Sequence, residues 1–141
     1  MTLLIPVLAS NIESDALASG ITFAQEHEGS LQVFLDFSNA DYTQDSMNNT
    51  IDAISEKLDV ADIQYRVETV LRGDDMVEKL TGAARANSND VVIVGLQSKI
   101  SQEKVHLGSQ IQRILLEVPC AVFILRPDTG DFFEPLQTSR E

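Results

Sequence analysis

A polar segment near the end of the chain has the residue types of a phosphate-binding loop. It begins at Gly95, where an apolar strand-like run stops, and it ends at Gly108 and Ser109, where a helical pattern begins. Free backbone N–H groups and the helix dipole at such a start favour an anion, and glycine lets a backbone approach a ligand closely. The segment is also longer than the loops of about two to six residues that usually join a strand to a helix. These residues predict a phosphate cradle.

The charge of this segment differs from that of the whole chain. Residues 96–113 contain three basic residues and one acid, a net charge of +2, whereas the chain as a whole carries −12. Lys99 and Lys104 are therefore candidate charge partners for a phosphate chain, and Arg113 and His106 could add to the positive field.

A structural interpretation of the same residues stays open. Ser109 and Gln112 can form a capping box, which would explain the serine by helix capping alone. Gly95 can be a tight exit from the strand, and the lysines can belong to a solvated face. Spacing alone does not separate the two interpretations, because isolated glycine pairs are weak signals.

Composition limits the classes of function. The chain has 141 residues with 43% hydrophobic content, which fits one folded domain. The charge of −12 repels polyanions, so generic binding to nucleic acid or to an anionic membrane is not expected. No apolar run approaches the ~20 residues of a membrane span. Cys120 is the only cysteine; it fits a reducing cytoplasm and is expected to be a buried, inert thiol.

The elements that must position these residues alternate along the chain. Apolar runs predict five strands, and apolar residues at helical spacing predict four helices between them. Strict alternation favours a three-layer α/β/α fold with a parallel sheet, and such sheets bind ligands beyond the carboxyl ends of their strands. The predicted strands cover residues 3–8, 31–37, 63–71, 91–94 and 121–125.

Several local features give sharper expectations. Ser10 and Glu13 predict a capping box at the start of the first helix, and Gly29 predicts its left-handed end. Met47, Ile51, Ile54 and Leu58 form one apolar helical stripe. Polar and apolar residues alternate over 63–71, which predicts an edge strand with one wet face. Pro6 conflicts with a central strand position, because it lacks a backbone N–H.

The loop residues also resemble a known family. Gly95, Ser98, Gly108 and Ser109 follow the spacing of the nucleotide motif of universal stress proteins, G-x2-G-x9-G-S/T. The resemblance extends to LLIPVLASNIESDAL, including its proline, to GDDMVEKLTGAARANSNDVVIVG and to LGSQIQRILLEVPCAVFIL. It implies a universal stress protein domain over residues 1–126 and a C-terminal tail over residues 127–141.

The family resemblance implies a sheet of strand order 3-2-1-4-5 and a homodimer paired through the last strand, 121–125. Some members bind ATP, whereas others act through protein contacts. Carried over to this chain, Gly95, Gly108 and Ser109 would contact the ribose and phosphates, with Ser98 and Gln110 beside them.

The end of the first strand would form the adenine and ribose side of that site, at Val7, Leu8 and Ala9. The chain departs from the family there and in the loop. Leu8 stands where ATP-binding members have an aspartate, and Ser98 replaces the second glycine of the motif. Gln110 is larger than expected beside phosphates. These departures weaken the expected contacts, since a lost polar anchor costs about 1–3 kcal/mol.

Two functions follow from the resemblance. The first is a cytoplasmic stress-response protein that acts as an adenine-nucleotide switch, with ATP as the expected ligand. The second is a nucleotide-free homodimeric interaction module with an unidentified regulatory protein partner. We expect no enzymatic turnover beyond slow ATP hydrolysis, and the sequence contains no metal-site spacing.

Other proteins of the same fold class fit less well. A phosphorylated receiver domain needs an acidic pair after the first strand, and a flavodoxin-like carrier needs a phosphate loop rich in Ser, Thr and Gly there. This chain has Ala9-Ser10-Asn11 at that place.

Overall fold

The structure, a computed structural model, describes residues 1–39, 41–86, 90–95 and 108–125. Strands and helices alternate throughout these ranges. Their bounds are β1 Thr2–Leu8, α1 Asp15–His27, β2 Ser30–Asp36, α2 Gln44–Val60, β3 Gln64–Val70, α3 Met76–Ala86, β4 Val91–Gly95, α4 Ser109–Glu117 and β5 Ala121–Leu125.

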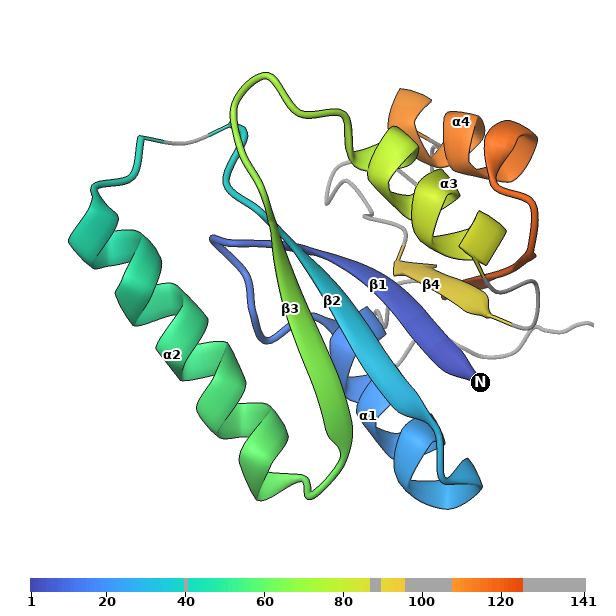
Figure 1. Ribbon diagram of the computed structural model, residues 1–141, viewed down its shortest axis with the longest axis horizontal. Helices are drawn as coiled ribbons and strands as arrows, with labels where there is room; N and C mark the ends of the chain where they lie inside the picture. The colour runs from blue at the N-terminus through green and yellow to red at the C-terminus, as the bar shows by residue number, and fades with distance from the viewer. Residues whose placement is uncertain (40, 87–89, 96–107, 126–141) are drawn as a thin grey trace, which may run out of the picture.

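The five strands form one parallel sheet in the order β3-β2-β1-β4-β5 (Figure 1). Helices α1 and α2 pack on one face, where buried residues such as Leu17 and Ile54 join the side chains of the strands. Helices α3 and α4 pack on the other face, through residues such as Leu80 and Ile114. The predicted three-layer fold and the strand order implied by the family resemblance are both confirmed.

Alternation along the strands divides the core into its two layers. In β1, Leu3, Ile5 and Val7 face α1 and α2, whereas Leu4 faces α3 and α4. The edge strand β3 has exposed residues at Gln64 and Arg66, as its alternating pattern predicted. An edge strand can present polar side chains to water on the face that no helix covers.

Helix α2 forms where its apolar stripe predicted it. Ile54 and Leu58 are buried, and Met47 and Ile51 pack against the same core. Thr43 caps the helix, because its hydroxyl accepts a hydrogen bond from the backbone N–H of Ser46 at 3.0 Å.

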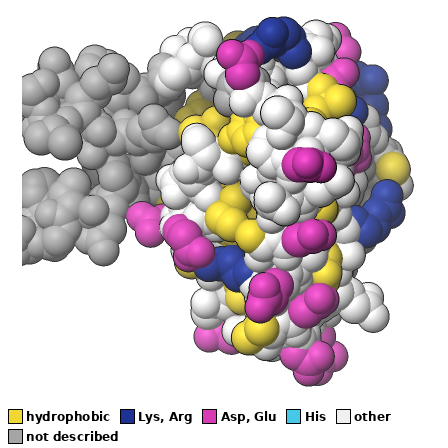
Figure 2. All heavy atoms as spheres, turned by 90° about the vertical axis from the view of Figure 1, so that its left-hand side faces the viewer, with side chains coloured by type: hydrophobic (Ala, Val, Ile, Leu, Met, Phe, Trp, Pro, Cys, Tyr) yellow, Lys and Arg dark blue, Asp and Glu magenta, His cyan; other side chains and the backbone are white. Residues whose placement is uncertain are grey.

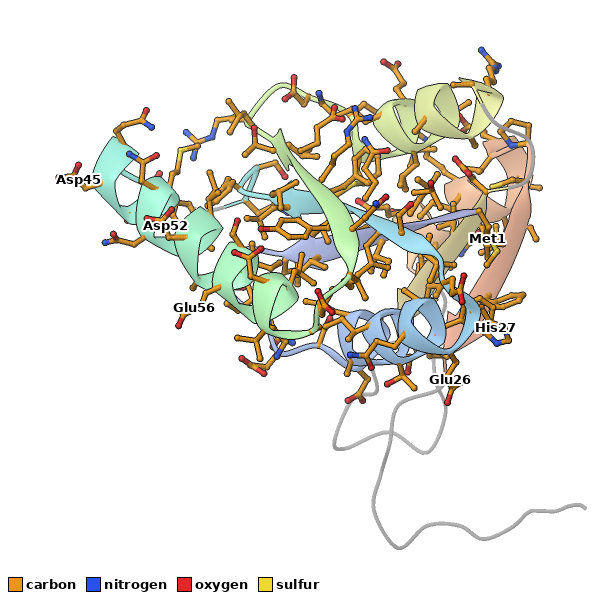
Figure 3. The ribbon with its side chains drawn as sticks, turned by 60° about the horizontal axis from the view of Figure 1, so that its bottom comes forward. Met1, Glu26, His27, Asp45, Asp52 and Glu56 are labelled. Atoms are coloured by element: carbon orange, nitrogen blue, oxygen red, sulfur yellow. The ribbon has the colours of Figure 1, made fainter. Side chains whose placement is uncertain are left out.

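The opposite face of α2 is acidic and solvated. Asp45, Asp52 and Glu56 project from it away from the core (Figure 3). Figure 2 views this side of the molecule and shows Asp and Glu side chains spread across it. This acidic face is expected to repel polyanions.

The first helix begins and ends at different residues from those predicted. It starts after Ser14, whose hydroxyl accepts from the N–H of Leu17 at 3.2 Å, so the prediction of a cap at Ser10 was wrong. Ser10 lies in a turn that directly follows β1. Both serines are suitable caps by sequence, and the turn out of β1 decides between them.

The helix ends at Glu28, which has the left-handed conformation with φ 54°, and not at Gly29 as predicted. Gly29 lies beside another backbone segment. A Cβ there would lie 3.4 Å from the backbone oxygen of Met1, which also accepts from the N–H of Ser30 at 3.2 Å. A Cβ at position 29 would therefore sit at the short end of ordinary van der Waals contact with this oxygen.

The central strand accommodates Pro6 because one of its ladders is short. β1 pairs with β2 along all seven residues, but its pairing with β4 is limited to Leu3 with Val91 and Leu4 with Val92. This second ladder ends before Pro6, so the missing N–H interrupts no pairing with β4. The sheet consequently opens between the carboxyl ends of β1 and β4, where the strand order reverses.

Candidate functional site

The opening between β1 and β4 is the place where a parallel sheet of this topology binds ligands. β1 ends there at Leu8, β4 ends at Gly95, and α4 begins after Gly108. By the topology of the sheet, these three element ends belong to its carboxyl edge, although they are up to a hundred positions apart in the sequence.

Neither glycine of the predicted cradle is required by the described part of the chain. Gly95 has no left-handed φ, and a Cβ on it would make an ordinary contact of 3.7 Å with the Cβ of Ala16. Gly108 is extended, with φ −66° and ψ 164°, and a Cβ on it would meet none of the described atoms within 4 Å. Packing against the described residues therefore does not explain these two glycines.

Within the described residues, helix α4 starts without a side-chain cap. Its N-cap residue is Gly108, whose carbonyl oxygen accepts from the N–H of Gln112 at 3.1 Å, and no side chain at the cap accepts from the first amides. Ser109 occupies the first helical position, so the interpretation of Ser109 as the capping residue was wrong. The extended conformation of Gly108 lets the helix begin one residue earlier than the sequence suggested.

Helices α1 and α2 each start with a side-chain hydroxyl cap. Ser14 caps α1 with φ −68° and ψ 153°, and Thr43 caps α2 with φ −85° and ψ 166°. Gly108 has almost the same backbone conformation but no hydroxyl. No side chain in the described part of the chain caps the first amides of α4, and amides of this kind can bind an anion. Ser109 and Gln110 beside them are exposed.

The end of β1 presents one side chain to this edge. Leu8 is 41% exposed, whereas Val7 and Ala9 are buried. Val7 packs in the layer that faces α1 and α2. Of the three residues predicted for the adenine and ribose side, Leu8 alone offers its side chain, and that side chain is apolar.

An acid on the neighbouring strand lies next to Leu8. Asp36 ends β2 and is paired in register with Leu8. Its carboxylate accepts from the N–H of Ser38 at 2.8 Å and from the hydroxyl of Ser38 at 2.6 Å. Sequence reasoning missed this residue; the signal was an aspartate at the end of a predicted strand with a serine two positions later.

The predicted positive field is smaller than the sequence suggested. Arg113 binds both carboxylate oxygens of Asp75, at 3.2 and 3.0 Å, and also pairs with Glu117. The hydrogen bonds from Arg113 lower the pKa of the Asp75 carboxyl, which also accepts from the N–H of Val77 near the start of α3. Arg113 thus joins α4 to α3. Ser98, Lys99, Lys104 and His106 lie outside the described residues, as does the tail 127–141.

Cys120 is half-buried rather than fully buried. Burial raises the pKa of its thiol, so the thiol stays protonated at neutral pH and is a poor nucleophile. The expectation of an inert thiol is supported by this environment.

None of the helices in the described ranges is both long and apolar enough to cross a membrane. Within the same ranges, no three His, Cys, Asp or Glu side chains are grouped as metal ligands.

Comparisons with known proteins agree with the fold. The model of the universal stress protein family matches residues 1–126. A search of curated protein sequences finds no match.

Several solved structures share the fold. A universal stress protein from Archaeoglobus fulgidus in complex with dAMP has a TM-score of 0.60 at 13% identity, over 88% of this chain and 96% of that one. An Arabidopsis thaliana family member with AMP bound has a TM-score of 0.57 at 8% identity, over 92% and 93%. A universal stress protein in complex with cAMP has a TM-score of 0.63 at 15% identity, over 89% and 96%.

Proposed function

This chain belongs to the universal stress protein family, and we propose that it is a regulatory or protective stress protein that binds an adenine nucleotide at the carboxyl edge of its sheet. The start of α4 carries this proposal. It has the backbone conformation of a capped helix, yet Gly108 supplies no side-chain cap, and a Cβ on it would meet no described atom within 4 Å. The phosphates of a nucleotide would take the place of the missing hydroxyl.

The adenine and ribose would lie toward the end of β1. Leu8 supplies no polar contact there, so we expect weaker binding than in family members that have an aspartate. The solved structures with dAMP, AMP and cAMP support the choice of an adenine nucleotide over other anions. ATP is the first ligand to test, and we propose that any hydrolysis is slow.

Calorimetry with ATP and magnesium tests this proposal, and Gly108→Ser sharpens the test. We expect the wild-type protein to give saturable heat at or below millimolar ATP. A serine at position 108 would cap the first amides as Ser14 does in α1, so stability should rise by a few tenths of a kcal/mol. Because the amides are then occupied, ATP affinity should fall about fivefold to tenfold.

The matched control is Thr43→Gly, which removes a hydroxyl cap from α2. It should lower stability by a few tenths of a kcal/mol and leave ATP affinity unchanged, because α2 lies away from the opening between β1 and β4. Absence of heat at millimolar ATP would show that the chain does not bind this nucleotide. Unchanged affinity in Gly108→Ser would place the phosphates somewhere other than at α4.

A nucleotide-free interaction module is the second candidate, and Leu8 is the observation that favours it. An exposed leucine in place of a carboxylate fits a protein contact better than a nucleotide contact. In that case the calorimetric titration gives no heat, and an unidentified regulatory partner binds at the surface.

Either function is proposed for a cytoplasmic homodimer paired through β5. This strand lies at the edge of the sheet, with β4 as its neighbour. Phe123 in its centre is 47% exposed and contacts Phe23 of α1 edge-to-face at 6.5 Å between ring centroids. An uncharged, exposed edge strand is normally covered, and a second copy of the same strand would cover it.

Light scattering tests the dimer. We expect a mass of twice the 15.5 kDa of one chain at micromolar protein. Phe123→Glu should give monomers, because a two-fold interface contains each substitution twice. Val60→Glu is the control, since Val60 is an exposed apolar residue of α2, beyond the opposite edge of the sheet. A monomeric mass for the wild-type chain would rule out this dimer.

A further inference from the structure

Part of the sheet face that bears α3 and α4 is polar and uncovered. Figure 1 views this face, and β2 and β3 run across it without a helix in front. In register, Ser30 pairs with Gln64 and Gln32 pairs with Arg66. These side chains and the flank of α3 line a groove of about 610 Å³, a volume within the usual range for small-molecule sites. The groove reaches the amino ends of the strands, opposite the proposed nucleotide site.

A buried carboxylate lies at the amino end of this groove. Asp90 is 6% exposed, and its Oδ1 accepts from the backbone N–H of Thr2 at 3.2 Å. No basic group in the described part of the chain forms an ion pair with it. A buried carboxylate without a cation is costly, and an ammonium group in the groove would compensate it. The Thr2 and Ser30 hydroxyls, 3.0 Å apart, offer further hydrogen bonds there.

An uncompensated cation lies farther along the groove. Arg66 is exposed on β3, and none of the ion pairs among the described residues involves it. Glu68, two residues later on the same face, is already bound on its two oxygens by Gln32 at 3.2 Å and by Lys79 at 3.1 Å. The guanidinium of Arg66 is therefore free to bind an anionic group.

We propose that this groove binds a small zwitterion, with its ammonium group against Asp90 and its carboxylate on Arg66. Asp90 precedes β4, one strand beyond Thr2, but its Oδ1 lies 3.2 Å from the backbone nitrogen of Thr2. From Thr2 on β1 to Gln64 on β3 there are two strand spacings, about 9.6 Å, and Arg66 lies about 6.6 Å farther along β3. The long side chain of Arg66 can shorten this separation. The geometry therefore suits a molecule whose amine and carboxylate are joined by several bonds, such as an ω-amino acid. The proposal does not depend on nucleotide binding at the other edge.

Amide NMR titration with 4-aminobutyrate and 6-aminohexanoate tests whether the groove binds a zwitterion. We expect saturable shifts at β2 and β3 around Ser30, Gln32 and Gln64 with at least one of the two probes. Butyrate and butylamine each lack one charge and should bind at least tenfold more weakly, as expected when a charge-assisted contact is lost. The backbone amides at the start of α4 should show no chemical shift change with either probe.

Two substitutions test which side chain binds each charged end of the zwitterion. Arg66→Gln should weaken the better zwitterion at least tenfold, whereas Arg72→Gln should have no effect, because Arg72 is an exposed arginine outside the groove that pairs with Asp41. Asp90→Asn keeps the acceptor for the N–H of Thr2 and removes the charge, so 4-aminobutyrate and butyrate should then bind alike.

Arg66 has a competing explanation, which is protection of an edge strand against association. That explanation predicts no saturable shift with either zwitterion at tens of millimolar. Such a result would overturn the proposal, as would zwitterion binding that is unchanged in Arg66→Gln.

Discussion

Leu8→Asp is expected to tighten adenine-nucleotide binding about tenfold to a hundredfold, because a hydrogen bond to a charged group contributes about 1.5–3 kcal/mol. Leu8 stands at the end of β1, beside the opening in the sheet, and is 41% exposed. A carboxylate there can reach a ligand without being buried. It would restore the contact that ATP-binding family members are expected to make at this position.

Asp36, the acid next to Leu8, affects how much the nucleotide affinity rises. Asp36 is paired in register with Leu8, and like charges on adjacent strands repel. The double variant Leu8→Asp, Asp36→Asn removes this repulsion, so we expect it to reach the upper end of the range. Calorimetry with ATP measures both variants.

Leu71→Asp is the matched control for this gain. Leu71 is 40% exposed at the same edge of the sheet, but it follows β3, which lies two strands away from β1. Its substitution adds the same charge and should not raise affinity. If Leu8→Asp and Leu71→Asp have the same effect, or if neither variant binds ATP, then the end of β1 is not the adenine and ribose side.

Leu80→Ala should lower the free energy of unfolding by about 2–5 kcal/mol, because it removes buried methyl groups and leaves a cavity. Leu80 is fully buried where α3 packs on the sheet, in the same cluster as Phe34 and Ile114. Denaturant unfolding at fixed protein concentration measures this loss.

Leu116→Ala makes the same chemical change on α4 and is the control. Leu116 is 86% exposed, so its substitution should change the free energy of unfolding by no more than about 0.5 kcal/mol. A comparable loss in both variants would mean that the outer surface of α4 is buried in solution, as it would be in a larger interface. A small loss in Leu80→Ala would contradict the packing of α3 described here.

Much of the fold was predictable because its signals are local. The stripe of Met47, Ile51, Ile54 and Leu58 predicted α2, and the alternation over residues 63–71 predicted an edge strand. Strict alternation of strands and helices implied a parallel sheet. The strand order came from the family resemblance, since periodicity does not state which strands are neighbours.

Helix ends were less predictable, because neighbouring residues offer equivalent caps. Ser10 and Ser14 both suit the start of α1, and the turn after β1 places the cap at Ser14. Ser109 has the sequence of a cap, but the conformation of Gly108 moves it into the helix. With that one-residue shift, no described side chain caps the first amides of α4, and this is the main support for the proposal of nucleotide binding.

By itself the sequence determined the elements, the α/β class and the loop between Gly95 and Gly108 as the candidate phosphate site. Only the tertiary structure decided that the sheet opens beside Pro6, that Asp36 lies next to Leu8, and that Arg113 is already bound by Asp75. It also placed Asp90 and Arg66 along one groove. The physical reason is range: hydrophobic periodicity and capping act over a few residues, whereas strand register and helix packing join residues that are far apart in the chain.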